Sequence, residues 1–380
     1  MLKRSPFRRI PRHLPGILFW AAFLPVFAGY AEPLRVSMLS PEPPQSLFWG
    51  QTMEFAKAVA EDLNNVDLDI VYPPVTSDSS SYIIKRLGMK ILNSQVKPDY
   101  LLTGYWGSAV DLFESAGKQH DIRIFMFNTD LTPEERSVIG KPRGKYPNWI
   151  GHMYPDDEQG GYELADILIG AAATQLNNTN PTIVALSGNT QSQVSMERLK
   201  GLQRRIDRDN DLSLKEVVST TWTRESAIKA TGEILDKHPE TTIIWTVSNE
   251  IALGCLQVLE ERGKHPGKDI LVGSFDWSGE GLKAIKDGRM VASMGGHFME
   301  AGWALIEIYD YQNGHDFKDD TGLVHITKMQ PITKNNVDRF QQRLGDRDWR
   351  KIDFRKFSKT LNPELKKYDF TLDALLNTLN

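Results

Sequence analysis

The stretch Thr242-Ile243-Ile244-Trp245-Thr246-Val247-Ser248-Asn249-Glu250, continued to Trp277, decides the fold of this 380-residue chain. Its apolar, β-branched beginning predicts a strand, and the amphipathic run from Ile251 to Leu259 predicts a helix. A second apolar run, from Ile270 to Phe275, predicts another strand, which ends in Asp276-Trp277. A strand, a helix and a strand of these lengths form a parallel βαβ unit. Ligands of open α/β sheets bind beyond the carboxyl ends of the strands, so we expect functional residues on the strand-ending loops.

Alternating strand and helix patterns continue on both sides of this stretch. Two successive alternating series predict an α/β protein with two doubly wound parallel-sheet lobes. The proline- and glycine-containing residues 131–148 predict a surface insertion, and the tail from Gly345 is expected to pack on the surface as short helices. Other expected strands are 34–39, 68–72, 99–103, 122–127, 149–153, 182–186, 215–219, 290–293 and 323–327; other expected helices are 50–64, 80–93, 108–116, 156–175, 196–207, 224–237, 279–286 and 298–312.

Composition and charge narrow the function classes. Hydrophobic residues make up 40% and charged residues 25%, which is typical of a globular protein. The formal net charge of -4 gives no reason to expect a nucleic-acid partner. The single cysteine, Cys255, rules out an intrachain disulfide, and its place on an apolar helix face indicates a small core residue.

The N-terminus has the pattern of a secretory signal peptide in residues 1–31. Basic residues between Lys3 and Arg12 precede an apolar run from Leu14 to Phe27, and Gly29-Tyr30-Ala31 is a small-x-small cleavage pattern. An uncleaved membrane anchor is the alternative, but the run is short and contains two prolines. We therefore expect cleavage after Ala31 and export, most simply to a bacterial periplasm.

Signatures of enzymes are missing from the sequence. It has no phosphate-binding loop, no dinucleotide-binding glycine turn after the first strand, no nucleophile elbow and no zinc-protease pair of histidines. Its eight histidines are scattered, without the spacing of metal ligands. We predict no catalytic residue, no cofactor and no metal site.

Aromatic and polar residues at the strand ends remain as candidates for a ligand-binding site. Aromatic rings stack on the apolar faces of sugars and polyols, while planar multivalent groups such as guanidinium and carboxylate hold adjacent hydroxyls. The candidate ligand-binding residues are Ser46, Phe48, Trp49, Asn128, Asp130, Arg198, Trp222, Ser248, Asn249, Asp276, Trp277 and His297.

Each candidate also has a purely structural interpretation. Any single aromatic residue can be a core residue. Arg198 can be a solvated helix residue, because Arg204, Arg205 and Arg208 follow it. Ser248, Asn249 and Asp276 can cap the helices that begin beside them, although a cap can contact a ligand as well.

At these residues the chain resembles the type I periplasmic binding proteins, in the ribose and galactose branch. The resemblance covers roughly Leu34 to Thr333 and places Arg198 at the family's ligand-binding arginine. The matching segments are Ser46–Trp49, Gly188–Gly201, Trp222–Ala227, Ser248–Gly254 and Gly273–Asp276.

Within that family the chain is also similar to the autoinducer-2 receptors of the LuxP type, through Ser46 with Trp49, Asn128 and Arg198. It departs from them near Gly296, where His297 stands close to the place of a second arginine, and Trp277 falls out of register. It departs from the sugar binders at Asn128-Thr129, where they have an Asp-Arg pair, and at Gly104, where they have asparagine.

The resemblance implies two lobes joined by a three-segment hinge near Tyr154, Gly296 and Ile326. The expected lobes are 32–154 plus 297–326 and 155–296 plus 327–345, followed by a tail at 346–380. It implies closure on a small sugar or sugar-like ligand, which is presented to the permease of an ABC importer. The alternative is a subunit that senses a sugar, polyol or autoinducer-2-like ligand and regulates a membrane sensor kinase. An exported hydrolase and a DNA-binding regulator of this fold are both disfavoured.

Overall fold

The computed structural model describes residues 1–2, 32–75, 81–104, 109–119 and 122–379. Nearly all of the predicted signal peptide therefore lies outside the described residues, and its cleavage site stays a prediction. The chain divides into Met1–Glu32 and Pro33–Asn380, and everything below concerns the second unit. Of the helices in the described part of the chain, none is long and apolar enough to cross a membrane.

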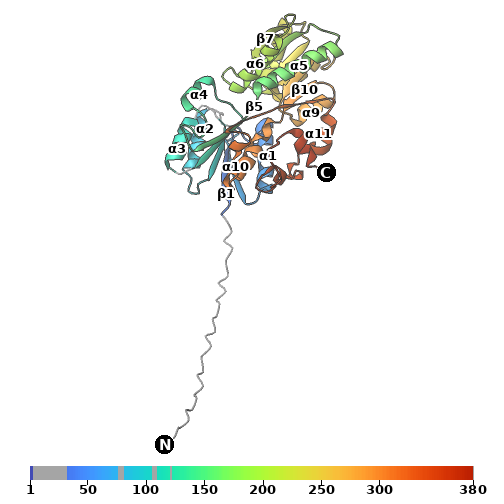
Figure 1. The fold of residues 1–380 in the computed structure, drawn as a ribbon. Coiled ribbons are helices and arrows are strands. Elements are labelled where there is room, and N and C mark those ends of the chain that lie inside the picture. Colours follow the sequence, from blue (N-terminus) through green and yellow to red (C-terminus); the bar gives the residue numbers. More distant parts are fainter. Residues whose placement is uncertain (3–31, 76–80, 105–108, 120–121, 380) are drawn as a thin grey trace. The chain divides into compact units, whose positions relative to one another are not determined.

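Within the described residues, the strands form two six-stranded sheets, each at the centre of one lobe (Figure 1). The first sheet has the order β11-β5-β4-β3-β1-β2, and all its neighbours are parallel. The second has the order β12-β10-β9-β8-β6-β7 and is parallel except for β12, which is antiparallel to β10. The predicted fold class, two doubly wound α/β lobes, is confirmed.

The bounds of the elements follow the predicted rhythm closely. The first lobe contains β1 (Leu34–Leu39), α1 (Leu47–Asp62), β2 (Val66–Val71), α2 (Ser81–Leu92), β3 (Tyr100–Thr103), α3 (Ala109–Gln119), β4 (Arg123–Phe127), α4 (Pro133–Ile139), β5 (Trp149–Pro155), α10 (Glu300–Gln312) and β11 (Val324–Thr327). The second contains α5 (Asp157–Gln175), β6 (Thr182–Ser187), α6 (Gln193–Ile206), β7 (Ser213–Ser219), α7 (Arg224–Lys237), β8 (Ile243–Thr246), α8 (Asn249–Glu261), β9 (Leu271–Phe275), α9 (Gly279–Lys286), β10 (Ala292–Gly295), β12 (Gln330–Thr333) and α11 (Val337–Leu344).

The chain changes sheets three times. It passes from the first sheet to the second after β5, returns after β10 through a short 3-10 helix (His297–Met299), and leaves again between β11 and β12. The proposed lobe boundaries at 154/155, 296/297 and 326/327 lie at or next to these changes. That the two lobes divide at these boundaries and move about them as a hinge stays a proposal.

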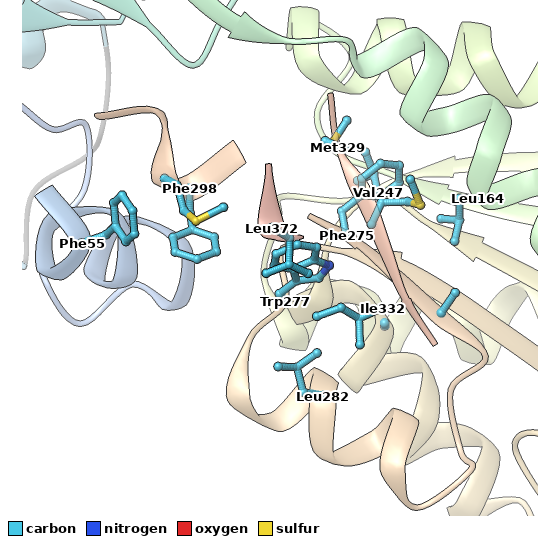
Figure 2. Packing of buried hydrophobic residues seen from close by; sticks show 14 of the residues in the cluster. Phe55, Leu164, Val247, Phe275, Trp277, Leu282, Phe298, Met329, Ile332 and Leu372 are labelled. Carbon is cyan, nitrogen blue, oxygen red and sulfur yellow. The ribbon is translucent and has the colours of Figure 1, made fainter. Parts of the chain in front are cut away.

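Burial explains which strands are central. Every residue of β3, β8 and β9 is buried, because helices cover both faces of a parallel sheet. The edge strands β2 and β7 alternate between more and less exposed residues, as expected where one face is less covered. Figure 2 shows part of the core, where Phe275, Trp277 and Ile332 pack within the second lobe.

The two segments expected on the surface bury more side chains than the sequence predicts, although the tail does form the expected short helices, Trp349–Lys351, Phe354–Phe357 and Leu372–Asn377. The segment 131–148 carries α4 with a capping box at Thr132, and it buries Ile139 and Tyr146. The tail beyond Gly345 buries many apolar side chains, because aromatic residues on α1 and α10 provide an apolar face for it. Its buried members are Trp349, Ile352, Phe354, Phe357, Leu372, Leu375 and Leu376.

Candidate functional site

Arg198 is the centre of a buried polar cluster beyond the ends of the second sheet's strands. Its side chain is only 3% exposed. Nε donates to Oδ1 of Asp157 at 2.7 Å, and Nη1 donates to the carbonyl oxygen of Val247 at 2.8 Å. The guanidinium lies over the ring of Phe275, with its carbon 4.2 Å from the centroid. Its orientation is therefore fixed by the protein, as a binding group requires.

Two glycines bring Arg198 and Asp157 together. A Cβ atom on Gly161 would lie 2.0 Å from the carbonyl oxygen of Arg198, and one on Gly201 would lie 1.9 Å from that of Glu158. Helices α5 and α6 thus approach more closely than larger side chains allow. The first turn of α5 then places Asp157 against Arg198. Burial raises the pKa of Asp157 to about 6, while the neighbouring guanidinium of Arg198 favours the ionised carboxylate.

His297 and Asp276 complete the polar cluster. Nε2 of His297 lies 3.2 Å from Nη2 of Arg198 and 3.3 Å from Oδ1 of Asp276. The neutral ring either accepts from Arg198 or donates to Asp276, depending on its tautomer. Nδ1 is buried and has no hydrogen-bond partner among the described residues. Burial lowers the pKa of His297, so the imidazole is neutral at pH 7.

The first lobe contributes an aromatic wall. Phe48 stacks on His297 with centroids 4.9 Å apart and an interplanar angle of 25°. Trp49 packs edge-on against Phe48 and Phe127. Ser46 caps α1 by accepting from the backbone N–H of Trp49 at 3.3 Å, so Phe48 and Trp49 lie in the first turn of the helix instead of before it. The sequence placed that helix start three residues too late.

Asn128 and Asp130 follow β4, the strand that ends beside Trp49. Asn128 is buried and has a φ of 73°, in the left-handed region that asparagine tolerates. Asp130 forms an ion pair with Arg136 and accepts from the backbone N–H of Leu131. Its carboxylate is therefore engaged within its own loop and with α4.

Ser248 and Asn249 begin α8 and hold the neighbouring loops. Ser248 is the N-cap, accepting from the backbone N–H of Ile251. The side chain of Asn249 donates to the hydroxyls of Ser274 and Ser293 and accepts from the backbone N–H of Ser278 at 2.7 Å. Its own backbone N–H donates to Asp276 at 3.2 Å. Both N–H groups of the Asn249 amide are thus used inside the protein, and the amide positions the loop that carries Asp276.

The two tryptophans on second-lobe loops differ in exposure. Trp222 is partly exposed, in a left-handed conformation with φ of 66°, and its indole covers Gly188, where a Cβ atom would lie 2.1 Å from the ring. Trp277 is fully buried and donates from its indole N–H to the carbonyl oxygen of Ser293 at 2.8 Å. The structure does not bring Trp277 to the Arg198 cluster as a ligand-facing group, because its ring packs edge-on against Phe298 and Phe340.

Sequence reasoning missed three residues of this region. Asp157 is the carboxylate partner of Arg198, but the sequence showed it only as part of an acidic helix start. Glu300 is fully buried and accepts from the hydroxyl of Thr327. Burial raises its pKa well above the usual value. Gln51 donates to the carbonyl oxygen of Asp276 at 2.9 Å. A helical carboxylate or amide gives no local signal that it will be buried against a residue far along the chain.

The arrangement is suited to binding a polar molecule that has apolar faces. It combines an oriented cation, an ionised carboxylate, a neutral imidazole and an aromatic wall. In the described part of the chain, no three His, Cys, Asp or Glu side chains are grouped as ligands of a metal ion.

Fold and cluster together define a two-lobed α/β binding protein, and comparison with known proteins supplies the family. A model described as a periplasmic binding protein domain matches residues 107–315, more than half of the chain, so the chain belongs to that family. The predicted resemblance to type I periplasmic binding proteins is confirmed. The likeness to autoinducer-2 receptors stays a prediction.

Individual relatives are sugar-binding proteins by name. A periplasmic sugar-binding protein from Pseudomonas fluorescens is 28% identical, with a TM-score of 0.79 over 90% of this chain and 99% of that one. The galactofuranose-binding protein YtfQ of Escherichia coli is 28% identical over 57% of this chain and 64% of its own length. The ribose import binding protein RbsB of Salmonella typhimurium is 24% identical over 38% of this chain. Since that match covers 46% of RbsB, the chain spans about half the length of such curated relatives.

Proposed function

We propose that the protein is an exported solute-binding protein that closes its two lobes on a small sugar and delivers it to an ABC importer of the inner membrane. The observation that carries this proposal is Arg198, a buried guanidinium held by Asp157 and the carbonyl oxygen of Val247 at the ends of the second sheet's strands. A first-lobe ring, Phe48, stacks on its neighbour His297. An arginine held so rigidly is suited to recognition of a ligand.

The residue types support a sugar as the ligand class. Guanidinium and carboxylate groups can each bond two adjacent hydroxyls, and the rings of Phe48 and Trp222 can cover the C–H face of a sugar. The unpaired Nδ1 of His297 supports a ligand with hydrogen-bonding groups, because an unsatisfied buried polar atom costs about 1–3 kcal/mol. The names of the relatives, which bind ribose and galactofuranose, point to the same class.

The proposed mechanism is hinged closure. Groups from the first lobe, such as Phe48 and Asn128, and groups from the second, such as Arg198 and Asp276, would contact one ligand simultaneously. A ligand that binds both lobes favours the closed state by its difference in affinity for the two states. Closure would then present a new combined surface of the two lobes to the permease.

A thermal-shift screen of the protein without residues 1–31 tests the proposed ligand class. The panel contains D-ribose, D-galactose, L-arabinose, D-allose, myo-inositol and autoinducer-2 with borate. We expect one sugar to raise the melting temperature, because binding to the native state stabilises it by mass action, by about 2.7 kcal/mol at a hundredfold excess over Kd. A response to autoinducer-2 alone would replace uptake with signalling, and no response in the whole panel would contradict the sugar proposal.

Delivery to an importer needs a separate test in the source organism. Deleting the gene should abolish uptake of the radiolabelled sugar found in the screen, and a plasmid copy should restore it. Unchanged uptake would contradict the importer proposal and leave the binding measurement intact.

A further inference from the structure

The chain continues past α11 and crosses from the second lobe to the first. Helix α11 packs against α9, where Lys286 pairs with Asp338 at 3.0 Å. A few residues later Trp349 packs against Phe55 of α1, with ring centroids 5.5 Å apart, and against Phe298 at the same distance. Residues 345–379 therefore begin beside the second lobe and then pack against the first lobe.

Anchoring on the first lobe is extensive. The backbone N–H of Phe354 donates to Asp62 of α1 at 2.6 Å. The buried carboxylate of Asp310, on α10, accepts from the Ser358 hydroxyl at 2.6 Å, the Lys359 N–H at 2.7 Å and the Tyr368 hydroxyl at 2.9 Å. Several bonds to one buried carboxylate fix the segment firmly on α10.

The segment then returns to the second lobe. The backbone N–H of Leu372 donates to the side chain of Gln330 on β12 at 2.7 Å. The short helix α12 (Leu372–Asn377) buries Leu375 and Leu376, and Arg343 of α11 donates to the carbonyl oxygen of Leu376 at 2.9 Å. Residues 345–379 are called the strap below. The strap is anchored on the first lobe in its middle, and it contacts the second lobe both before and after that anchor.

Arg347 lies where the strap crosses between the lobes. Its guanidinium donates to the side-chain oxygen of Gln51 on α1 and to the carbonyl oxygen of Trp277. Gln51 in turn donates to the carbonyl oxygen of Asp276. Asp276 and Trp277 have φ values of 96° and 54°, so two successive residues with side chains adopt the left-handed conformation. Such a turn persists only where its surroundings hold it.

From this chain of contacts we propose that the strap couples the two lobes, and that Arg347 and Gln51 are positioning residues that hold the Asp276–Trp277 turn of the candidate site. Gln51 contacts the Arg198 cluster through a hydrogen bond to the backbone of Asp276, and Arg347 contacts the backbone of the next residue, Trp277. They act on the carbonyl oxygens of the turn, and the turn fixes the carboxylate of Asp276 beside His297. The inference deepens the proposed function, because it makes the strap part of the closure of the sugar site.

A ligand-free experiment tests the coupling, so that its result does not depend on the sugar screen. Spin labels are placed at Lys90→Cys on α2 and Lys229→Cys on α7, two exposed positions on different lobes, in a Cys255→Ala background. Double electron–electron resonance gives the distance distribution between the lobes. Hydrogen exchange followed by mass spectrometry gives the protection of the amides from Asp276 to Ser278.

Arg347→Met and Gln51→Leu remove the contact from its two sides, and Arg350→Met is the matched control. Arg350 lies on the same strap and pairs with Glu61 of α1, away from the turn. We expect Arg347→Met and Gln51→Leu each to broaden and lengthen the distance distribution and to speed exchange of the turn roughly tenfold, the effect of one charge-assisted hydrogen bond. The Arg350→Met protein should match the parent in both readouts.

Two results would overturn the proposal. The first is a distance distribution and an exchange rate in Arg347→Met equal to the parent's, even if its melting temperature falls, because Arg347 would then be merely structural. The second is an equal change in Arg347→Met and Arg350→Met, which would mean general loosening of the tail. If Arg347→Met does not fold, as circular dichroism would show, Gln51→Leu decides the question.

Discussion

Asp157 and Arg198 form a buried ion pair, while Asp166 and Arg205 form an exposed one between the same two helices. We predict that Asp157→Asn lowers the free energy of unfolding by about 3 kcal/mol, because it removes the nearer of the two carboxylates that pair with a buried guanidinium and leaves Asp276 at 3.9 Å. Ligand affinity should fall with it, since Arg198 loses the group that orients it. Denaturant unfolding and calorimetric titration measure the two effects.

Asp166→Asn is the matched control for that prediction. An exposed ion pair contributes at most about 1 kcal/mol, so this variant should stay close to the parent in stability and in affinity. Equal effects of the two substitutions would contradict the special role of the Asp157–Arg198 pair.

His152 gives a pH prediction in the first lobe. It is fully buried, its Nε2 bonds to the carbonyl oxygen of Thr129 at 2.9 Å, and its Nδ1 has no partner in the described part of the chain. Burial lowers its pKa from 6.5 to about 4. Between pH 6.5 and pH 4, His152 binds a proton more readily in the unfolded chain than in the folded protein. It therefore makes the protein lose about 3 kcal/mol of stability in total as the pH falls through this range.

His152→Gln isolates this effect from Asp157 and Glu300, whose raised pKa values act in the opposite direction. Glutamine keeps an N–H donor for the carbonyl oxygen of Thr129 and does not titrate in this pH range. The stability of the parent relative to His152→Gln should therefore decline between pH 6.5 and pH 4, as measured by urea unfolding at several pH values. A constant difference across that range would disprove the prediction.

The polar cluster was partly predictable from sequence at the level of single residues. Arg198, Asp276, His297 and Phe48 were predicted candidates, and the structure brings them together. Whether they bind ligand stays a proposal. Asn249 and Trp277 looked equally suitable, because position after a strand does not reveal whether a side chain faces a ligand or pairs inside the protein. Asp157 was missed, because its partner lies 41 residues away.

At the scale of elements, the crossing of α5 and α6 depends on glycine. We predict that Gly161→Ala destabilises the protein by about 2 kcal/mol or more, because the added Cβ would overlap the backbone of Arg198. Pushing α6 away should also weaken ligand binding. Thermal unfolding and calorimetric titration test both effects.

Gly170→Ala in the same helix is the control. A Cβ atom at Gly170 would meet nothing within 4 Å, so alanine should stabilise α5 by about 1 kcal/mol through its higher helix propensity. If Gly161→Ala behaves like Gly170→Ala, the close approach of the helices is not needed.

Most elements could be predicted because the two hydrophobic periods are clear in the sequence. Helix α7 has the predicted bounds, Arg224–Lys237, and the buried strands β8 and β9 read as apolar runs. Strand β12 (Gln330–Thr333) was missed, since it is short and contains Pro331. The start of α1 was misplaced because Phe48 and Trp49 were taken as a loop, whereas Ser46 caps the helix before them.

At the scale of the whole molecule, the strap belongs to the core of Pro33–Asn380. Phe354 is fully buried against Phe55 and Trp303. We predict that Phe354→Ala lowers the free energy of unfolding by about 3–5 kcal/mol, the usual result of emptying a large buried site. Tyr82→Ala, at a residue that is 70% exposed, should change it by less than about 0.5 kcal/mol. A small effect of Phe354→Ala in denaturant unfolding would mean that the strap is only loosely attached.

The role of the tail was beyond sequence reasoning for a physical reason. Its composition predicted a tail that packs on the surface as short helices, while its apolar residues are too irregularly spaced to give a long helical or strand period. Their partners, Phe55, Phe298 and Trp303, lie on helices already assigned to another lobe. Only the folded chain shows that the first lobe and the tail share one aromatic cluster.

The central claim is that the two lobes bind one sugar at Arg198. Isothermal titration calorimetry of the protein and its Arg198→Lys variant, with the sugar identified by the screen, tests it most directly. We predict one site per chain in the parent and a loss of affinity of about a hundredfold or more in Arg198→Lys, since an ammonium cannot replace the oriented fork of donors. Arg205→Lys, on the same helix, should bind as the parent does. Unchanged affinity in a folded Arg198→Lys protein would contradict the claim.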